Sequence, residues 1–492
     1  MRFTRFPVAL LAVAAVAGAC STDLTGLNKN PNSPTTAPAT ALFTNATQAT
    51  MTRFWGSFQT LSMSELFSQH IAQAQYVDED RGRVRPGTID ALFTNIYSIE
   101  LEDYQKVIDQ GKAANNPNVS GPAIVMQSWV FQNATDLWGD IPYSDALKGD
   151  AGGSLTPKYD PQKDVYYGLL KSLTDASTAM VAGQAGLAGA DPIYKGDAAK
   201  WKKFANSLRA RMALRMSKAD PAKAATELSA AFAAGVMTSN ADNAALTWPG
   251  DGAFDNPWAT NFATRDDHRV SKTLLDTMLA LADPRVKVYA QPTKADPTKY
   301  AGLQNGMDNI TVAPFFNTTS RPGAVFYPGA TSYGTFGTAA GKKTPSYILT
   351  YSEVEFIAAE AAEKGLAGQS GAATHYANAV RASILQWGGT DAEATAYLAV
   401  PGVAYVAGAT GLAQIGLQKW ISMFTQGTEA WSEWRRTGNP ASIKPGPKMY
   451  WNYVNRRMPY STAEASVNNI NLQAAITRQG PDDYSTRIWW DK

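Results

Sequence analysis

Apolar residues recur every three or four positions through much of the chain, which is the spacing of helices that bury one face. One apolar stripe runs through residues 165–180, and a second runs through 201–212 after a loop rich in Gly and Ala. Asp197 lies where it can cap the second helix. Two amphipathic helices joined by a loop predict an antiparallel hairpin, whose apolar faces need further helices to cover them.

Further stretches with helical spacing lie on both sides of this hairpin. Pro122 suits the first turn of one helix, and Ser352 with Glu355 forms a capping box at the start of another. Gly438 and Pro440 are expected to end the last long helix. The other helical stretches are expected near residues 66–74, 96–108, 122–137, 220–234, 271–281, 371–386 and 412–436.

Two long segments, residues 238–268 and 284–347, lack any sustained period and are rich in Gly, Pro, Asn, Thr and aromatic residues. Short strands are expected at 309–316 and 324–327. Long irregular segments in a compact protein usually carry function. The expected fold class is therefore mainly α: a scaffold of helical pairs with long irregular loop insertions and a few short strands.

The N-terminus has the pattern of a secretory signal peptide over residues 1–19, with two arginines, an apolar run and small residues before Cys20. This pattern resembles the lipobox of bacterial lipoproteins, although Ala17 stands where Leu is usual. Cys20 is therefore the predicted lipidation site and membrane anchor. The alternative is an ordinary signal peptide cut elsewhere, with Cys20 as a free thiol. Residues 20–41 read as a polar tether, followed by a single domain over 42–492.

Composition narrows the choice of partner. The formal charge is +2, and both excess bases lie in the expected signal peptide, so nothing basic suggests a nucleic-acid partner. The chain has no cysteine besides Cys20, hence no disulfide framework. No second apolar run is long enough to span a bilayer. The 13 Trp, 21 Tyr and 18 Phe could supply both a core and flat surface platforms for a ligand.

Motifs for catalysis or cofactor binding are missing from the sequence. The three histidines lie far apart and form no metal-binding spacing, and neither a nucleophile elbow nor a complete phosphate loop is present. Residues 78–80 resemble the start of a calcium loop, but Gly82 and Arg83 break the pattern. We therefore predict no catalytic, metal or cofactor residues. Glycosidase chemistry needs only two carboxylates, so a surface glycoside hydrolase stays open as an alternative.

Several short motifs, taken together and in order, resemble the SusD/RagB-like family of outer-membrane nutrient-binding lipoproteins, specifically its SusD-like 2 branch. Each motif alone is weak, but the set runs from the tether to the C-terminus. The motifs are Asp23–Asn32, Asp136–Tyr143, Asp283–Arg285, Leu349–Ala361, Gln418–Ile421, Glu429–Gly438 and Arg456–Tyr460.

The resemblance implies a scaffold of tetratricopeptide-like helix pairs, with the irregular insertions forming the ligand surface. It also implies a non-enzymatic role on the outer face of the outer membrane, at the cell surface. There the protein is expected to capture an oligosaccharide or peptide and deliver it to a SusC-like TonB-dependent transporter. A helical scaffold that binds another protein is a further alternative. The motif residues themselves are expected to be structural. Glu360 should pair with a buried Arg or a helix terminus, and Trp420, Trp431 and Trp434 should lie in the core.

Ligand contacts are expected in the irregular segments, because a sugar site combines flat rings with charged or amide groups. The tryptophans at 248 and 258 flank a Gly-Asp-Gly turn, and a charged run follows closely. For each residue, packing of the loop is the alternative to ligand contact. The candidates are Trp248, Trp258, Arg265, Asp266, His268, Tyr327, Tyr333 and Tyr76.

Overall fold

The computed structural model describes residues 37–149, 152–331, 334–335 and 337–492, without the side chains of 331–336. Residues Ala39–Lys492 form one structural unit. The expected signal peptide, Cys20 and most of the expected tether lie outside the described residues. Helical structure begins at Ala39, directly after Pro38 and before the expected boundary at residue 42.

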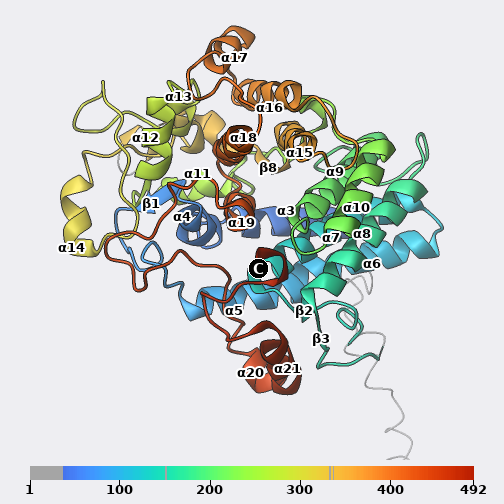
Figure 1. Ribbon diagram of the computed structural model, residues 1–492. Helices are drawn as coiled ribbons and strands as arrows, with labels where there is room; N and C mark the ends of the chain where they lie inside the picture. The colour runs from blue at the N-terminus through green and yellow to red at the C-terminus, as the bar shows by residue number, and fades with distance from the viewer. Residues whose placement is uncertain (1–36, 150–151, 332–333, 336) are drawn as a thin grey trace, which may run out of the picture. The chain divides into compact units, whose positions relative to one another are not determined.

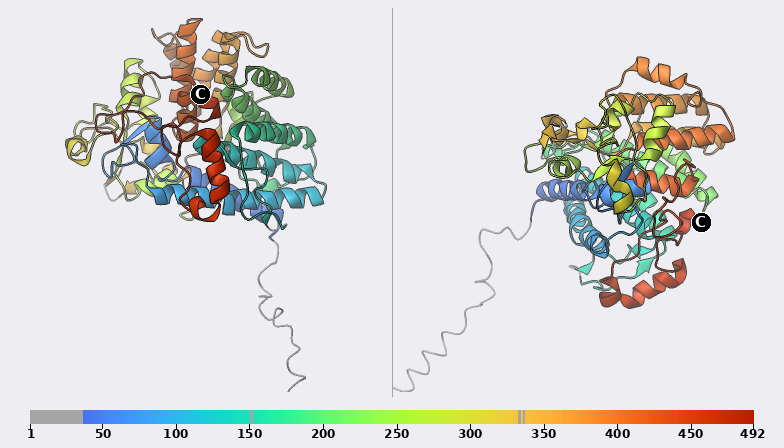
Figure 2. Two further views of the ribbon diagram at one scale, coloured as in Figure 1. Left: turned by 60° about the horizontal axis from the view of Figure 1, so that its bottom comes forward. Right: turned by 90° about the vertical axis from the view of Figure 1, so that its left-hand side faces the viewer.

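The described unit is mainly helical, as predicted, and its first half is a series of long helices that pack against their chain neighbours (Figure 1, Figure 2). Asp197 caps α9 and accepts hydrogen bonds from the backbone N–H groups of Ala199 at 2.9 Å and Lys200 at 3.2 Å. These helices are α3 (Ala39–Phe54), α6 (Glu102–Ala113), α7 (Pro117–Trp138), α8 (Gln162–Ala179), α9 (Ala198–Arg215) and α10 (Pro221–Ala234).

A second group of helices forms the C-terminal half of the scaffold. α15 packs on α16 and α18 within this group and also contacts α9 of the first group, so the two groups share a core. The members are α15 (Tyr351–Glu363), α16 (Ala372–Gln386), α17 (Asp391–Leu398), α18 (Ala409–Ser422) and α19 (Gly427–Thr437).

The expected single helix over 412–436 is wrong, because α18 ends at Ser422 and α19 begins at Gly427. Between them Thr425 adopts a left-handed φ of 76°, which is rare for a β-branched residue. A Cβ atom on Gly427 would lie 2.6 Å from the backbone nitrogen of Glu65. The break therefore lets α19 approach the segment around Glu65, while the apolar period runs through both helices.

Two predicted helix starts also differ from the structure. α15 begins at Tyr351 with Thr350 as its cap, because Ser352 is buried and donates its hydroxyl to the carbonyl oxygen of Ala379. α7 begins at Pro117, which places Pro122 inside the helix.

Short helices occupy the irregular segments and the ends of the unit. The strands expected at 309–316 and 324–327 are wrong. Asp308 and Thr311 form a capping box that starts a helical turn in the first, and residues 324–326 form a 3-10 turn in the second. The short α-helices are α4 (Glu65–Phe67), α5 (Pro86–Asn95), α11 (Pro257–Phe262), α12 (Lys272–Ala280), α13 (Val286–Tyr289), α14 (Asn309–Val312), α20 (Glu464–Val467) and α21 (Asn469–Gln479). The π-helical turns are η1 (Thr60–Ser64) and η2 (Ile96–Leu101). The 3-10 turns are η4 (Ala188–Ala190), η5 (Asn240–Asp242), η6 (Ala313–Phe315), η7 (Ala324–Phe326), η8 (Ala339–Lys343) and η9 (Trp489–Asp491).

The strands form short antiparallel pairs that join distant parts of the chain. β1 pairs with β5 so that Gln73 lies opposite His268. This pairing brings the segment after α4 beside the first irregular insertion. The strands are β1 (Ile71–Gln73), β2 (Ile141–Pro142), β3 (Tyr159–Asp160), β4 (Ala244–Leu246), β5 (His268–Val270), β6 (Ala330–Thr331), β7 (Gly334–Thr335) and β8 (Ser346–Leu349). The other pairs are β2 with β3, β4 with β8 and β6 with β7.

Aromatic side chains fill much of the core where the helices meet. The Trp201 ring lies edge-on to Phe43 and to Tyr194, with centroids 6.0 and 5.2 Å apart. Such rings bury large apolar areas and lock helices in register. None of the helices in the described ranges is both long and apolar enough to cross a bilayer.

Candidate functional site

Three neighbouring pockets open just after the end of α3. Their volumes are about 310, 390 and 360 Å³, and all three have Ser57 in their walls. Ser57 follows Gly56, where a Cβ atom would lie 2.8 Å from the carbonyl oxygen of Thr52. Glycine is therefore needed for the sharp exit from the helix. We call the three pockets around Ser57 together the groove. The pocket of about 310 Å³ is lined by Phe58 and Tyr76, and we call it the Phe58–Tyr76 pocket.

Exposed aromatic rings stand along the groove. Phe58, Tyr76 and Phe254 are 52, 61 and 42% exposed. Tyr76 has a left-handed φ of 55°, a conformation that few residues other than glycine adopt and that clusters at functional sites. Asp251 holds the loop of Phe254 in place by accepting the Phe254 backbone N–H at 2.9 Å. The rings are therefore accessible on an ordered framework.

Two arginines in the Phe58–Tyr76 pocket have matching surroundings. The Arg85 guanidinium lies 5.7 Å from the centroid of Phe58 and donates its Nε–H to Glu79. The Arg265 guanidinium lies 5.0 Å from the centroid of Tyr76 and donates its Nε–H to Asp267 at 2.7 Å. Each arginine is thus held by a carboxylate on one side and an aromatic ring on the other.

Neutral polar side chains complete the walls of this pocket. Gln73 is fixed because it donates to the Ser62 hydroxyl at 3.5 Å and accepts the Asp80 backbone N–H at 3.2 Å. The side-chain nitrogen of Asn261 is buried in the groove wall, and within the described ranges it has no hydrogen-bond partner. A buried amide left without a partner commonly marks a place where a ligand or water binds.

The charge state of His268 follows from its burial. Desolvation lowers the pKa of His268 to about 3, and the nearby Arg269 and Arg265 add to this effect. The ring is therefore neutral at any physiological pH. Burial raises the pKa of Asp267, although Arg265 opposes that shift.

Two of the predicted contact residues, Trp248 and Trp258, are packed inside the protein, at 2 and 1% exposure. Trp248 donates its indole N–H to the Ser346 hydroxyl at 2.9 Å, and Trp258 donates to Thr60 at 3.0 Å. Trp258 lines none of the groove pockets, so we assign it to loop packing. Trp248 is also mainly packed, but it contributes to the wall of the pocket of about 360 Å³ beside Phe254, and its contact with a ligand stays a prediction. They anchor the insertion that carries Phe254.

Tyr327 and Asp266 are also interior residues. The Tyr327 ring stacks on Phe262 with centroids 4.6 Å apart. The Asp266 carboxylate accepts from Arg269 at 3.0 Å and from Arg321 Nε at 2.6 Å. Both are therefore reassigned from ligand contact to the framework beneath β5. The expected contact Tyr333 lies outside the described residues.

The structure brings Tyr76, Arg265 and His268 into the wall of one pocket, as a shared ligand site requires. Sequence reasoning missed Phe58, Phe254 and Arg85. An aromatic residue directly after a Gly-Ser turn at a helix end was the available signal for Phe58. Arg85 has no comparable signal, because its partners are set by the fold.

A family model described as "starch-binding associating with outer membrane", SusD-like 2, matches residues 31–461. The chain belongs to the SusD-like 2 family. A search of curated proteins finds no match.

Solved structures similar to this SusD-like chain include a chitin-binding protein with 29% identity and a TM-score of 0.79, covering 92% of this chain and 100% of that one. A chitin-binding SusD homologue from Flavobacterium johnsoniae has 25% identity and a TM-score of 0.78, covering 92% and 98%. A SusD homologue from Bacteroides ovatus has 25% identity and a TM-score of 0.79, covering 92% and 99%. The SusD-like fold is thereby confirmed over most of the chain.

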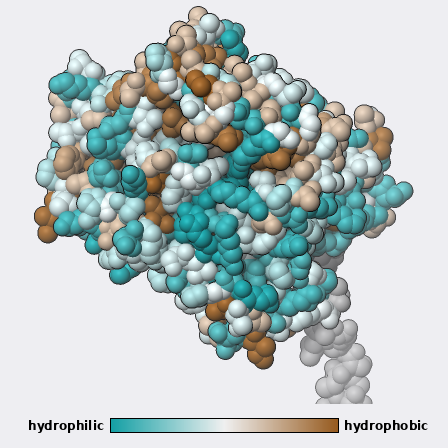
Figure 3. All heavy atoms as spheres, viewed as in Figure 1, coloured by the Kyte–Doolittle hydropathy of each residue, from teal (hydrophilic) through white to brown (hydrophobic). Residues whose placement is uncertain are grey.

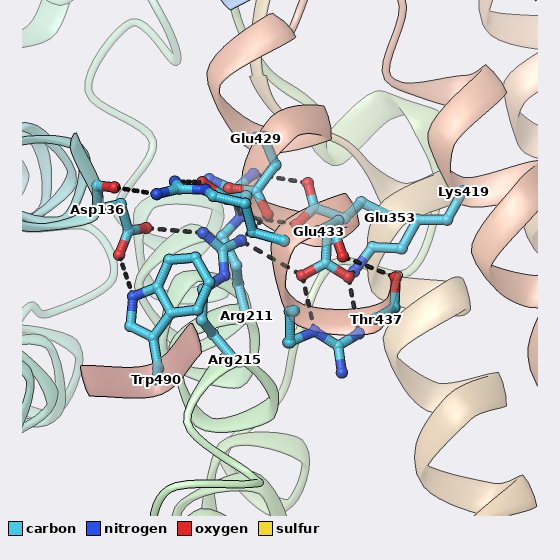
Figure 4. A network of polar contacts seen from close by, with 12 residues as sticks. Asp136, Arg211, Arg215, Glu353, Lys419, Glu429, Glu433, Thr437 and Trp490 are labelled. Carbon is cyan, nitrogen blue, oxygen red and sulfur yellow. Dashed lines mark hydrogen bonds and ion pairs between the residues drawn. The ribbon is translucent and has the colours of Figure 1, made fainter. Parts of the chain in front are cut away.

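The SusD-like motifs of the sequence meet in a buried network of charges (Figure 4). Arg215 donates to Asp136 at 2.7 Å, and Asp136 also accepts the indole N–H of Trp490 at 2.8 Å. Lys419 donates to Glu433 at 2.8 Å. All five side chains are buried. The network joins α7, α9, α18 and α19, so these motifs serve the scaffold.

Other motif residues confirm the expected structural role. Glu360 pairs with the buried Arg436, whose Nη1 lies 2.7 Å from the carboxylate. Trp420 and Trp431 are 1 and 0% exposed, whereas Trp434 is only partly buried against the core. The described residues contain no cluster of His, Cys, Asp and Glu that could hold a metal ion.

Proposed function

We propose that the groove captures a saccharide without cleaving it. The observation that carries this proposal is the exposure of Phe58, Tyr76 and Phe254 along the three pockets around Ser57. A pyranose ring has an apolar C–H face and an equatorial rim of hydroxyls. Exposed rings suit the face, and amide or guanidinium groups suit the rim.

The comparisons support a saccharide over a peptide as the ligand. The family description names starch, and the printed names of two similar structures name chitin. Starch and chitin are both polymers of pyranose units. Chitin and starch oligosaccharides are therefore the first ligands to test.

The test compares exposed aromatic residues inside and outside the groove. We expect Tyr76→Ala or Phe58→Ala to weaken oligosaccharide binding about tenfold, which corresponds to loss of one stacking contact. Phe315→Ala is the matched control, because Phe315 is 43% exposed and does not line the groove. Isothermal titration measures the affinities. Equal affinity in all variants would exclude the groove as the binding site.

The alternative function is hydrolysis of the saccharide, and the pairing of the groove carboxylates argues against it. Asp267 is bound to Arg265, and Asp255 forms an ion pair with Lys342 at 3.0 Å. Both carboxylates that line the groove are thus engaged by a cation, whereas glycoside cleavage needs two carboxyl groups placed on either side of the scissile bond. Prolonged incubation with a glycan panel should release no reducing ends; their release would favour a glycoside hydrolase.

We also propose that Cys20 is lipidated and anchors the protein to the outer membrane, facing the cell surface. The position of the lone cysteine after a signal-like segment supports this, together with the family description. Stable anchoring needs more than one acyl chain, which lipoprotein modification supplies. Cys20→Ser should move the protein from the membrane fraction to the soluble fraction. Retention of this variant in the membrane would contradict the anchor.

Delivery of the ligand to a SusC-like TonB-dependent transporter is the proposed next step. Leu155, Val467 and Ile470 are 88, 64 and 86% exposed, and Asn471 ties their two segments together by donating to the Thr156 carbonyl at 3.0 Å. Apolar residues are visible at the tip formed by α20 and α21 (Figure 3). Such residues suit contact with a protein partner.

Co-purification from detergent-solubilised outer membranes tests the partner. A barrel protein should accompany the wild type, and Ile470→Lys should reduce its yield. Capture of other proteins without a barrel would instead favour the helical protein-binding scaffold.

A further inference from the structure

We infer that the Phe58–Tyr76 pocket recognises an anionic group on the captured saccharide, a carboxylate or a sulfate. This inference rests on the proposed saccharide-binding function and adds the chemical class of the ligand. It follows from the arrangement of Arg85 and Arg265 and from the positions of their partner carboxylates.

Both arginines present unused donors to the pocket. Arg85 and Arg265 each donate Nε–H to one carboxylate, and their terminal Nη1 and Nη2 groups have no hydrogen-bond partner within the described ranges. Both side chains line the same pocket. A guanidinium fixed at Nε still offers terminal N–H groups, which match the oxygens of a carboxylate or sulfate.

The charges of each pair are arranged with the cation toward solvent. The Arg85 side chain is 58% exposed, whereas its partner Glu79 is 3% exposed. The Arg265 side chain is 49% exposed, whereas Asp267 is 8% exposed. A ligand in the pocket therefore meets both guanidinium groups. Glu79 does not line the pocket, and Asp267 contributes to its wall but is engaged by Arg265.

The aromatic rings make these arginines stiffer than ordinary surface arginines. Phe58 and Tyr76 hold the guanidinium groups by cation–π contact, so less side-chain entropy is lost when a ligand binds. Neutral hydroxyls could also accept these N–H groups. An ionised acceptor forms hydrogen bonds about twice as strong, so the pocket should favour the anionic ligand.

The preference for an anionic group is expected only at the end of the groove that contains the Phe58–Tyr76 pocket. His268 is neutral and adds neither attraction nor repulsion. At the other end, Asp255 lines the pocket beside Phe254, and Asp251 is exposed in the adjoining loop. An anionic unit is therefore expected next to Tyr76 and not next to Phe254.

Matched pairs of neutral and anionic oligosaccharides test the inference on protein that lacks residues 1–20. Oligogalacturonide against its methyl ester changes only the carboxylate, and sulfated chitohexaose against chitohexaose changes only the sulfate. In at least one pair, the anionic member should bind at least tenfold more tightly at about 20 mM salt. The ratio should shrink at about 200 mM salt, because salt screens exposed charges.

Substitution of each arginine tests whether the preference for the anionic ligand comes from this pocket. Arg85→Gln and Arg265→Gln should each reduce the ratio between anionic and neutral ligand severalfold. Arg487→Gln is the matched control, because the Arg487 side chain is 54% exposed and pairs with the buried Asp491 outside the groove. The control should leave the ratio unchanged.

The outcomes separate this inference from the proposed function. Equal binding of neutral and anionic members would overturn the inference and leave saccharide capture intact. A preference that survives both Arg85→Gln and Arg265→Gln would also overturn it. Failure of every saccharide, including starch oligosaccharides, to bind would overturn the proposed function together with the inference. The pair that shows the preference identifies a carboxylate or a sulfate as the recognised group.

Discussion

Arginine, carboxylate and aromatic ring occur together in two parts of this protein, with opposite consequences. In the buried network, Arg436 has a fully buried side chain, and all three guanidinium nitrogens donate to Glu360 or Glu433. In the groove, Arg265 is half exposed and uses only Nε. In the network, the guanidinium donors of Arg436 are paired with carboxylates of the fold. In the groove, the terminal donors of Arg265 remain available to a ligand.

The comparison shows that residue type alone does not identify a binding site. Arg215 in the core lies 5.4 Å from the Trp490 ring, much as Arg265 lies 5.0 Å from Tyr76. What differs is exposure and the number of terminal nitrogens already paired. These two properties separate the scaffold from the site in this protein.

Replacing an arginine by glutamine in each region should give the largest difference in the free energy of unfolding. Arg436→Gln should lower the free energy of unfolding by about 3–5 kcal/mol, because two buried carboxylates lose their partner. Arg265→Gln should lower it by no more than about 1 kcal/mol, because the arginine is 49% exposed and only one carboxylate, Asp267, loses its partner. Urea unfolding followed by circular dichroism measures both. Similar losses of unfolding free energy in the two variants would show that Arg265 serves the fold as Arg436 does.

Acid should weaken the network through Glu360. Burial opposes ionisation of Glu360, but Arg436 outweighs it and lowers the pKa below the usual value of 4.5. The stability contributed by this pair is therefore complete above pH 4.5 and is lost as the pH falls through the lowered pKa. Each unit of lowering corresponds to about 1.4 kcal/mol.

Unfolding free energies measured between pH 6 and pH 2.5 check this prediction. Glu360→Gln should be less stable than the wild type near neutral pH and should lose less stability as the pH falls. A variant with the same pH dependence as the wild type would show that other carboxylates govern acid unfolding.

Trp258 tests whether the insertion is anchored by the residues first expected to bind the ligand. Trp258→Phe should lower the free energy of unfolding by about 1–2 kcal/mol, through loss of the hydrogen bond to Thr60 and some packing volume. Saccharide affinity should stay within twofold of the wild type. A large loss of affinity with unchanged stability would return Trp258 to the binding site.

The helical scaffold could be predicted from the sequence because its signal is local. The stripe before Asp197 and the cap at Asp197 depend only on residues a few positions apart. The break at Thr425 could not be predicted this way, since the apolar period continues through it and its cause is the approach of Gly427 to Glu65. For the long helices, presence was therefore more predictable than the ends. The helix expected near 66–74 is wrong, because only the single turn α4 forms there and the strand β1 follows it.

The candidate site was only partly predictable for the same reason. Irregular, aromatic-rich insertions pointed to the right region, and Tyr76, Arg265 and His268 share a pocket. Exposure of each ring depends on distant contacts, such as the one between Trp258 and Thr60. The residues next to an aromatic side chain in the sequence do not indicate these distant contacts. Buried and exposed aromatic residues therefore cannot be told apart from local sequence.

The smallest expected effect concerns the contact between Arg85 and Phe58. A double-mutant cycle with Arg85→Gln and Phe58→Leu should give a coupling of about 0.5–1 kcal/mol in the free energy of unfolding, since the guanidinium lies 5.7 Å from the ring and is exposed. Chemical unfolding of the four proteins measures the coupling. A coupling above about 2 kcal/mol would mean that this pair serves the fold as the buried network does, and its guanidinium would then be a poor candidate for binding a ligand. A small coupling, with reduced selectivity for anionic saccharides in Arg85→Gln, would instead place the function of Arg85 in the ligand complex.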